Sequence, residues 1–119
     1  MNGNQFGDYL RKLRQSKQIT QEQLATAVQR HKMTISQIEN GKNEPPQGDL
    51  LENIIQALGA TPAEEYELRD LSALARDSIP SDILNYFKDN EGIRAAIRRA
   101  KSNDINNEAW NKVFKGETV

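Results

Sequence analysis

The stretch TQEQLATAVQRHKMTISQIENGK, residues 20–42, decides the fold of this 119-residue chain. Thr20 followed by Gln23 is typical of a capping box, in which each residue satisfies a backbone group of the other at the start of a helix. Apolar residues then recur at helical spacing on both sides of an interruption, which predicts two short helices joined by a tight turn. Their inward positions are Leu24, Ala25, Val28, Ile35 and Ile38.

Two short helices that pack through these residues form a helix-turn-helix, because their buried faces hold them at a steep angle. The outward face of the second helix is then free to enter a major groove, which is wide enough to admit a helix. An ordinary solvated helix face is the alternative interpretation of the same polar side chains. The candidates for reading base edges are His31, Lys32, Met33, Ser36 and Gln37.

The rest of the chain also predicts helices, and no segment shows the alternation of a strand, so the expected fold class is all-α. Phe6, Leu10 and Leu13 share one face of a first helix. Gly41 and the following proline pair end the third helix. Thr61 and Pro62 start a helix that runs to about residue 77. Further helices are predicted over 49–58, 81–88, 91–101 and 107–115.

The amino-acid composition excludes several classes of site and function. The chain has no cysteine and one histidine, which excludes disulfides and multi-histidine metal sites. It lacks a Gly-rich phosphate loop and a nucleophile beside a base, so we expect no cofactor, no metal and no enzyme activity. No stretch reaches the roughly 20 apolar residues of a membrane span, and the N-terminus lacks a signal-peptide pattern. We therefore expect a cytoplasmic protein with no membrane partner.

Net charge is unevenly distributed along the chain. The overall value of -1 and the pI near 5.9 are unlike those of typical nucleic-acid-binding domains, whose pI exceeds about 9. Acidic residues, however, concentrate in residues 60–92, which hold eight Asp and Glu against three Lys and Arg. The overall net charge is therefore lowered by an acidic middle segment, and the two ends of the chain are mildly basic.

The quoted stretch resembles the helix-turn-helix signature of the phage-repressor-like Xre family. The resemblance rests on its Thr-Gln-Glu opening, its Leu-Ala pair, Ile-Ser in the second helix and the closing Ile-Glu-Asn-Gly-Lys. LRKLRQSKQI upstream and LLENIIQALG downstream extend it over about residues 6–59. It implies a five-helix repressor-like domain over residues 1–60 that binds double-stranded DNA and regulates transcription.

The resemblance also assigns roles to individual residues. The base-facing positions of the family match the outward candidates already named, from His31 to Gln37. Arg14 and Glu39 match a charged pair that ties the first helix to the end of the third. The positions that meet the DNA backbone match Gln21, Asn40, Lys42 and Asn43.

Four residues depart from the family pattern. Gln18 and Gln29 stand where the family favours glycine after a helix, Arg30 where it has an apolar residue, and His31 where Ser or Thr caps the recognition helix. A left-handed residue other than glycine and a lost cap each cost about 1 kcal/mol. The departures affect the positions of Arg30 and His31 in the turn more than those of Lys32 and Gln37 in the helix.

Residues 61–119 are predicted to form a helical extension for dimerisation or partner binding. It resembles the C-terminal extension of some short Xre-type regulators. Its aromatic and aliphatic residues form either a core or an intersubunit contact, and the dimerisation candidates are Phe87, Ile97, Trp110 and Phe114. The expected function is a dimeric repressor on a palindromic operator. The alternative is an antitoxin whose extension binds a partner toxin while its DNA-binding domain represses their operon.

Overall fold

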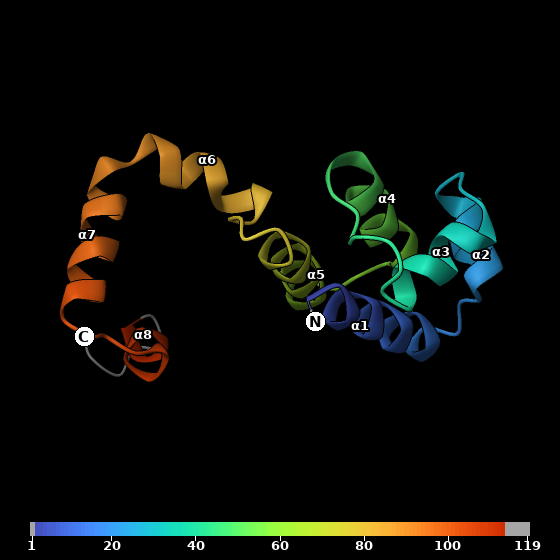
Figure 1. Cartoon of the computed structure of the whole chain (residues 1–119), viewed down its shortest axis with the longest axis horizontal. Coiled ribbons are helices and arrows are strands. Elements are labelled where there is room, and N and C mark those ends of the chain that lie inside the picture. The colour runs from blue at the N-terminus through green and yellow to red at the C-terminus, as the bar shows by residue number, and fades with distance from the viewer. Residues whose placement is uncertain (1, 114–119) are drawn as a thin grey trace. The chain divides into compact units, whose positions relative to one another are not determined.

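A computed structural model of the chain describes the backbone of residues 2–113 and the side chains of residues 5–113. Within that range it contains eight helices and no strand, in the order shown in Figure 1, which confirms the all-α prediction. The helices are α1 (Asn2–Ser16), α2 (Gln21–Ala27), α3 (Lys32–Glu39), α4 (Gly48–Leu58), α5 (Pro62–Leu74), α6 (Ser81–Asp89), α7 (Glu91–Ser102) and α8 (Asn107–Val113).

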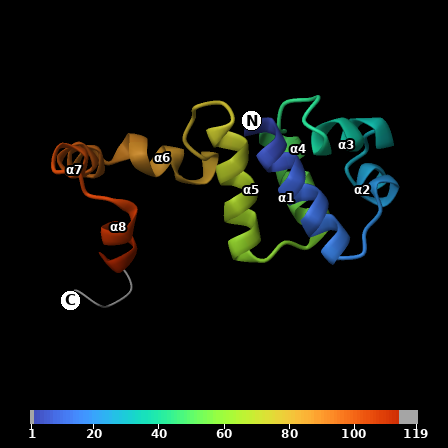
Figure 2. The same ribbon diagram turned by 60° about the horizontal axis from the view of Figure 1, so that its bottom comes forward.

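The chain divides into two compact units, the first ending at Asp82 and the second beginning at Ile83. In the first unit α1 packs against α3 and α5, while α2 packs against α3 and α4. Figure 2 shows α1 lying alongside α5. Helix α5 therefore belongs with the first four helices, and the boundary expected after residue 60 lies inside this unit.

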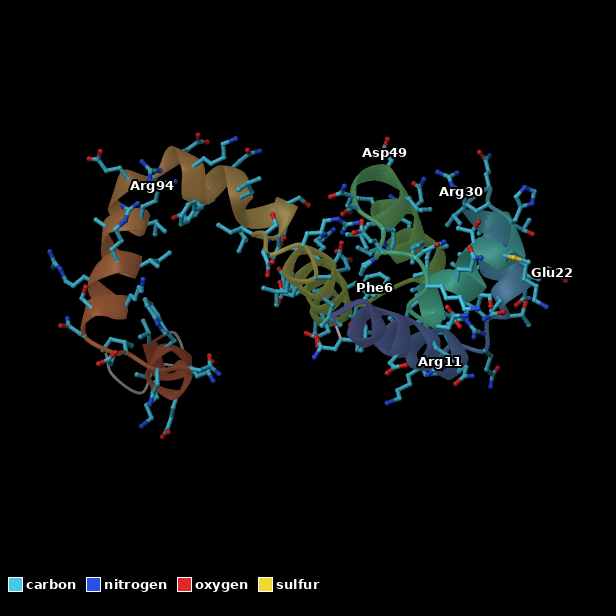
Figure 3. The ribbon with its side chains drawn as sticks, viewed as in Figure 1. Phe6, Arg11, Glu22, Arg30, Asp49 and Arg94 are labelled. Carbon is cyan, nitrogen blue, oxygen red and sulfur yellow. The ribbon has the colours of Figure 1, made fainter. Side chains whose placement is uncertain are left out.

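One hydrophobic core holds the first unit together, and all five of its helices contribute to it. The inward positions expected for the helix-turn-helix, from Leu24 to Ile38, are all buried. Figure 3 labels Phe6 on α1, where its side chain is completely buried. The other completely buried apolar side chains are Leu10, Ile35, Ile54 and Leu68.

Local sequence signals set the ends of these helices. The backbone N–H of Gln23 donates to the Thr20 hydroxyl over 3.0 Å, and the Thr20 N–H donates to the Gln23 carboxamide over 2.9 Å. Thr61 and Glu64 form the same reciprocal cap at α5. The hydrogen bond from the Thr61 N–H, with help from Lys17, lowers the pKa of Glu64. Both capping boxes follow directly from residue spacing.

The second unit lacks a buried core among its described residues, 83–113. Helices α6 and α7 are amphipathic, yet the larger apolar side chains of this unit are mostly exposed to solvent. Of the dimerisation candidates, Phe87 is half-buried, Ile97 and Trp110 are 45% and 43% exposed, and Phe114 lies outside the described residues. None of the helices in the described part of the chain is long and apolar enough to cross a membrane.

Candidate nucleic-acid interface

The turn between α2 and α3 is built from a left-handed glutamine. Gln29 has φ of 59°, a conformation that glycine adopts with less strain. The Gln29 N–H donates to the Thr26 carbonyl over 3.2 Å, and the Arg30 N–H donates to the Ala25 carbonyl over 2.9 Å. This pair of bonds is the Schellman motif, which satisfies the last carbonyls of a helix. The departure at Gln29 thus preserves the motif at the cost of backbone strain.

Helix α3 begins without a side-chain cap. His31 is its N-cap residue in extended conformation, and the structure records no capping hydrogen bond from its side chain. Ile35 and Ile38 fix the rotation of α3 because both are buried against the rest of the unit. Lys32 and Met33 are therefore exposed, while Ser36 and Gln37 are half-exposed on the next turn. All four project from the side of α3 that faces away from the core.

An open groove of about 600 Å³ runs along this side of α3. It gathers four of the five predicted base-facing residues and three of the four predicted backbone contacts, although these come from α2, α3 and the loop after α3. His31 and Asn43 are the two that do not line it. The groove is lined by Gln21, Lys32, Met33, Ser36, Gln37, Asn40 and Lys42.

A buried ion pair holds α1 and α3 together behind this groove. Arg14 donates from Nε and Nη2 to the two carboxylate oxygens of Glu39, over 2.6 and 3.0 Å. Its remaining terminal nitrogen donates to the Ile19 carbonyl over 2.9 Å. Gln21 joins from α2 by donating to Glu39 over 2.9 Å. Loss of one partner of such a pair costs about 3–5 kcal/mol, since a charge is left buried alone.

The loop after α3 is shaped by hydrogen bonds to Gln37. The N–H groups of Lys42 and Asn43 both donate to the Gln37 backbone carbonyl, over 2.9 and 3.1 Å. The Asn43 carboxamide also donates to the Gln37 side-chain oxygen over 3.1 Å. Asn43 therefore orients the Gln37 side chain from outside the groove. Gly41 has φ of 81°, which lets the chain reverse direction here.

Helix α5 and the residues just after it anchor the next part of this loop. Pro45 and Pro46 are both buried. The Ser72 hydroxyl donates to the Pro46 carbonyl over 2.6 Å, and the Arg76 guanidinium donates to the Pro45 carbonyl. Because the loop carrying Lys42 runs directly into these prolines, α5 limits its movement relative to α3.

Two lysine side chains at the groove are available to bind an anion. Lys32 and Lys42 are exposed, and neither forms an ion pair with another residue in the described part of the chain. Figure 3 shows Arg30 and Glu22 at the outer edge of the helix-turn-helix, where both side chains are exposed. Across residues 5–113 no group of three His, Cys, Asp or Glu side chains could hold a metal ion.

Sequence reasoning missed two structural supports of this interface. Gly7 lies on α1 where it meets the end of α3, and a Cβ there would overlap the backbone carbonyls of Ile38 and Glu39. Its signal was a glycine inside an otherwise helical pattern. The contacts of Ser72 and Arg76 with the prolines had no local signal, since they join residues far apart in the sequence.

Comparison with known proteins agrees with this geometry. The family model described as a helix-turn-helix domain matches residues 5–68, which is more than half of the chain. No curated protein and no solved structure matches the chain. The match spans α1 to α4 and the first half of α5, and it is consistent with the resemblance to Xre-type regulators. The chain therefore belongs to the helix-turn-helix domain family.

Proposed function

We propose that the chain is a sequence-specific transcriptional regulator that acts as a dimeric repressor on a palindromic operator. The observation that carries the proposal is the groove along α3. The burial of Ile35 and Ile38 turns Lys32 and Gln37 outward, where they meet residues that suit phosphate contacts. Lysine pairs with guanine and glutamine with adenine in the major groove. No group in this groove suggests catalysis, so we propose binding as the whole activity, in the cytoplasm where DNA is accessible.

The sequence preference is tested by selecting bound fragments from random duplexes with the full-length protein. We expect a two-fold site whose half-sites are about one helical turn apart. Lys32→Ala or Gln37→Ala then removes a base-edge hydrogen bond worth about 1–3 kcal/mol and relaxes the preference at one base pair. A selection that yields no preferred sequence contradicts the proposal.

Lys42→Ala is the matched control for these substitutions. Because Lys42 contacts phosphate in this proposal, its loss weakens binding to all sequences alike and reduces the salt slope by about one phosphate. The slope of the unaltered protein should be shallow, since Lys32 and Lys42 are the only lysines that line the groove. Unchanged preference in the Lys32 and Gln37 variants contradicts the proposed register of α3 on DNA.

Two features support a dimer: the few base pairs that one recognition helix can read, and the exposed apolar faces of the second unit. One recognition helix reads only a few base pairs, so useful specificity needs two copies about 34 Å apart. Helices α6–α8 have no buried residue, and helices this short are unstable without packing partners. Their exposed apolar faces therefore fit a contact with another protein surface, and a second copy is the simplest one.

The same exposed faces support a second candidate function, an antitoxin. In this candidate α6–α8 bind a partner toxin, while the first unit represses the shared operon. A toxin-like reading frame next to the gene favours it over a simple repressor. A full-length protein that stays monomeric on DNA would favour it as well.

A further inference from the structure

The outer side of α5 is an exposed apolar surface that also carries two acidic side chains. Tyr66 and Leu74 are each 57% exposed, and Ala63, one turn before Tyr66, is exposed on the same side of the helix. The spacings of three residues from Ala63 to Tyr66 and eight from Tyr66 to Leu74 place them opposite Leu68 and Ser72, which face the core. Two acidic residues lie on the same side of the helix. At 100° per residue, Glu67 is at one edge of this surface, and Asp70 is between Tyr66 and Ala63. We call these residues, Ala63, Tyr66, Glu67, Asp70 and Leu74, the outer face of α5.

Neither acidic residue on the outer face of α5 forms an ion pair within the described part of the chain. Partial burial and the neighbouring Glu67 and Asp82 raise the pKa of Asp70, which indicates that like charges gather there. The nearest arginine on the helix, Arg69, is engaged elsewhere, because it donates to Glu52 over 2.8 Å and to Glu65 over 3.3 Å. The outer face of α5 therefore suits a partner that is both apolar and positively charged.

Helix α7 has this complementary pattern. Its apolar stripe consists of Ile93, Ala96, Ile97 and Ala100, and the largest exposed member, Ile97, is 45% exposed. At 100° per residue, Arg99 lies on one edge of this stripe and Lys101 on the other, whereas Arg98 lies on the opposite side of the helix.

Both basic residues at the edges of the stripe are available for a contact, whereas Arg94 is already engaged within the chain. Arg94, labelled in Figure 3, donates to the carbonyls of Phe87 and Lys88 over 2.8 and 2.6 Å and so caps α6. Within the described residues, Arg99 and Lys101 have no ion-pair partner. The stripe of α7 with Arg99 and Lys101 at its edges therefore lacks an acidic counterpart.

We propose that α7 of one copy docks on the outer face of α5 of a second copy, and that the second copy returns the same contact. The inference rests on the dimer of the proposed function. Reciprocal exchange gives a two-fold interface, the arrangement that a palindromic operator requires. A second copy fits better than DNA, because the apolar stripe at the centre of the basic edges has no counterpart on a phosphate backbone.

The proposal is tested by reversing charges on each side of the contact in the full-length protein. One variant carries Glu67→Lys and Asp70→Lys, and the other carries Arg99→Glu and Lys101→Glu. In each variant alone like charges meet at both contacts, so we expect the dissociation constant of the dimer to rise about a hundredfold. Sedimentation velocity without DNA measures the effect, and circular dichroism confirms that each variant is folded.

Mixing the two variants separates exchange between copies from docking within one copy. In an equimolar mixture every docked α7 meets an α5 face of opposite charge, so heterodimers form although each variant alone is monomeric. The control, Arg98→Glu with Lys88→Glu, makes the same change of charge on residues outside the contact and leaves the dimer intact.

Three outcomes overturn the inference. They are an unaltered protein that is monomeric, a mixture that remains monomeric, and an Arg99 and Lys101 variant that still dimerises but binds DNA with a smaller salt slope. The last would make α7 a phosphate contact. These results do not depend on the selection of an operator, so a protein that dimerises as proposed but selects no DNA sequence would fail only the proposed function.

Discussion

At the scale of single residues, Gly7 decides how closely α1 approaches the recognition helix. A Cβ at this position would overlap the backbone carbonyls of Ile38 and Glu39, which are part of the helix and have little room to move. Gly7→Ala should therefore lower the free energy of unfolding by about 1–3 kcal/mol, although alanine favours a helix more than glycine does. Urea unfolding of the full-length protein measures the difference.

Gly92 provides the matched control for that substitution. It lies in the first turn of α7, and a Cβ there meets no other atom within 4 Å. Gly92→Ala should leave stability unchanged or raise it slightly. Equal losses from both alanine substitutions would contradict the proposed role of close approach at Gly7.

Residue-scale features were predictable only where a pattern signals them. The ion pair of Arg14 and Glu39 was expected from the family resemblance, and the structure contains it. The hydrogen bond from the Ser72 hydroxyl to the Pro46 carbonyl was not expected, because no local sequence pattern signals a bond between residues so far apart. Base-reading roles for Lys32 and Gln37 remain predictions, since they depend on how the protein docks on DNA.

At the scale of elements, the starts of helices were easier to predict than their ends. Thr20 and Thr61 start α2 and α5 through capping boxes that the sequence spells out. Helix α1, by contrast, ends in a Schellman motif centred on Gln18, where φ is 58°. Glutamine rarely adopts this conformation, so the sequence identified Gln18 and Gln29 only as departures from a pattern. At both ends the chain adopts this conformation against the local preference of glutamine.

A substitution in the left-handed turn between α2 and α3 should therefore stabilise the protein. Gln29→Gly keeps the backbone and its hydrogen bonds but removes the strain of φ near 59°, so we expect the free energy of unfolding to rise by about 1 kcal/mol. Chemical unfolding monitored by circular dichroism measures the gain. Gln15→Gly on the exposed side of α1 is the control and should lose about 1 kcal/mol. A loss at Gln29 would show that its side chain stabilises the turn.

At the scale of the whole molecule, the sequence predicted both parts of the chain but placed the division early. The family resemblance, which covers about residues 6–59, suggested a boundary at residue 60. The first unit continues to Asp82, because Leu68 completes the core and α5 packs on α1 and α4. Packing between distant segments decides such a boundary, and the extent of a local sequence resemblance is a poor guide to it.

Ending the chain after Asp82 tests what the second unit contributes. The remaining residues contain the whole hydrophobic core, so we expect a folded protein with the unfolding behaviour of a small domain. Without α6–α8 the first units of the two copies are no longer joined. Operator affinity should therefore fall by about 10²- to 10⁴-fold, which is the usual gain from linking two binding modules. Sedimentation should show a monomer where the full chain forms a dimer. A truncated protein that still sediments as a dimer would place the interface within α1–α5 and leave the second unit free to bind a different protein.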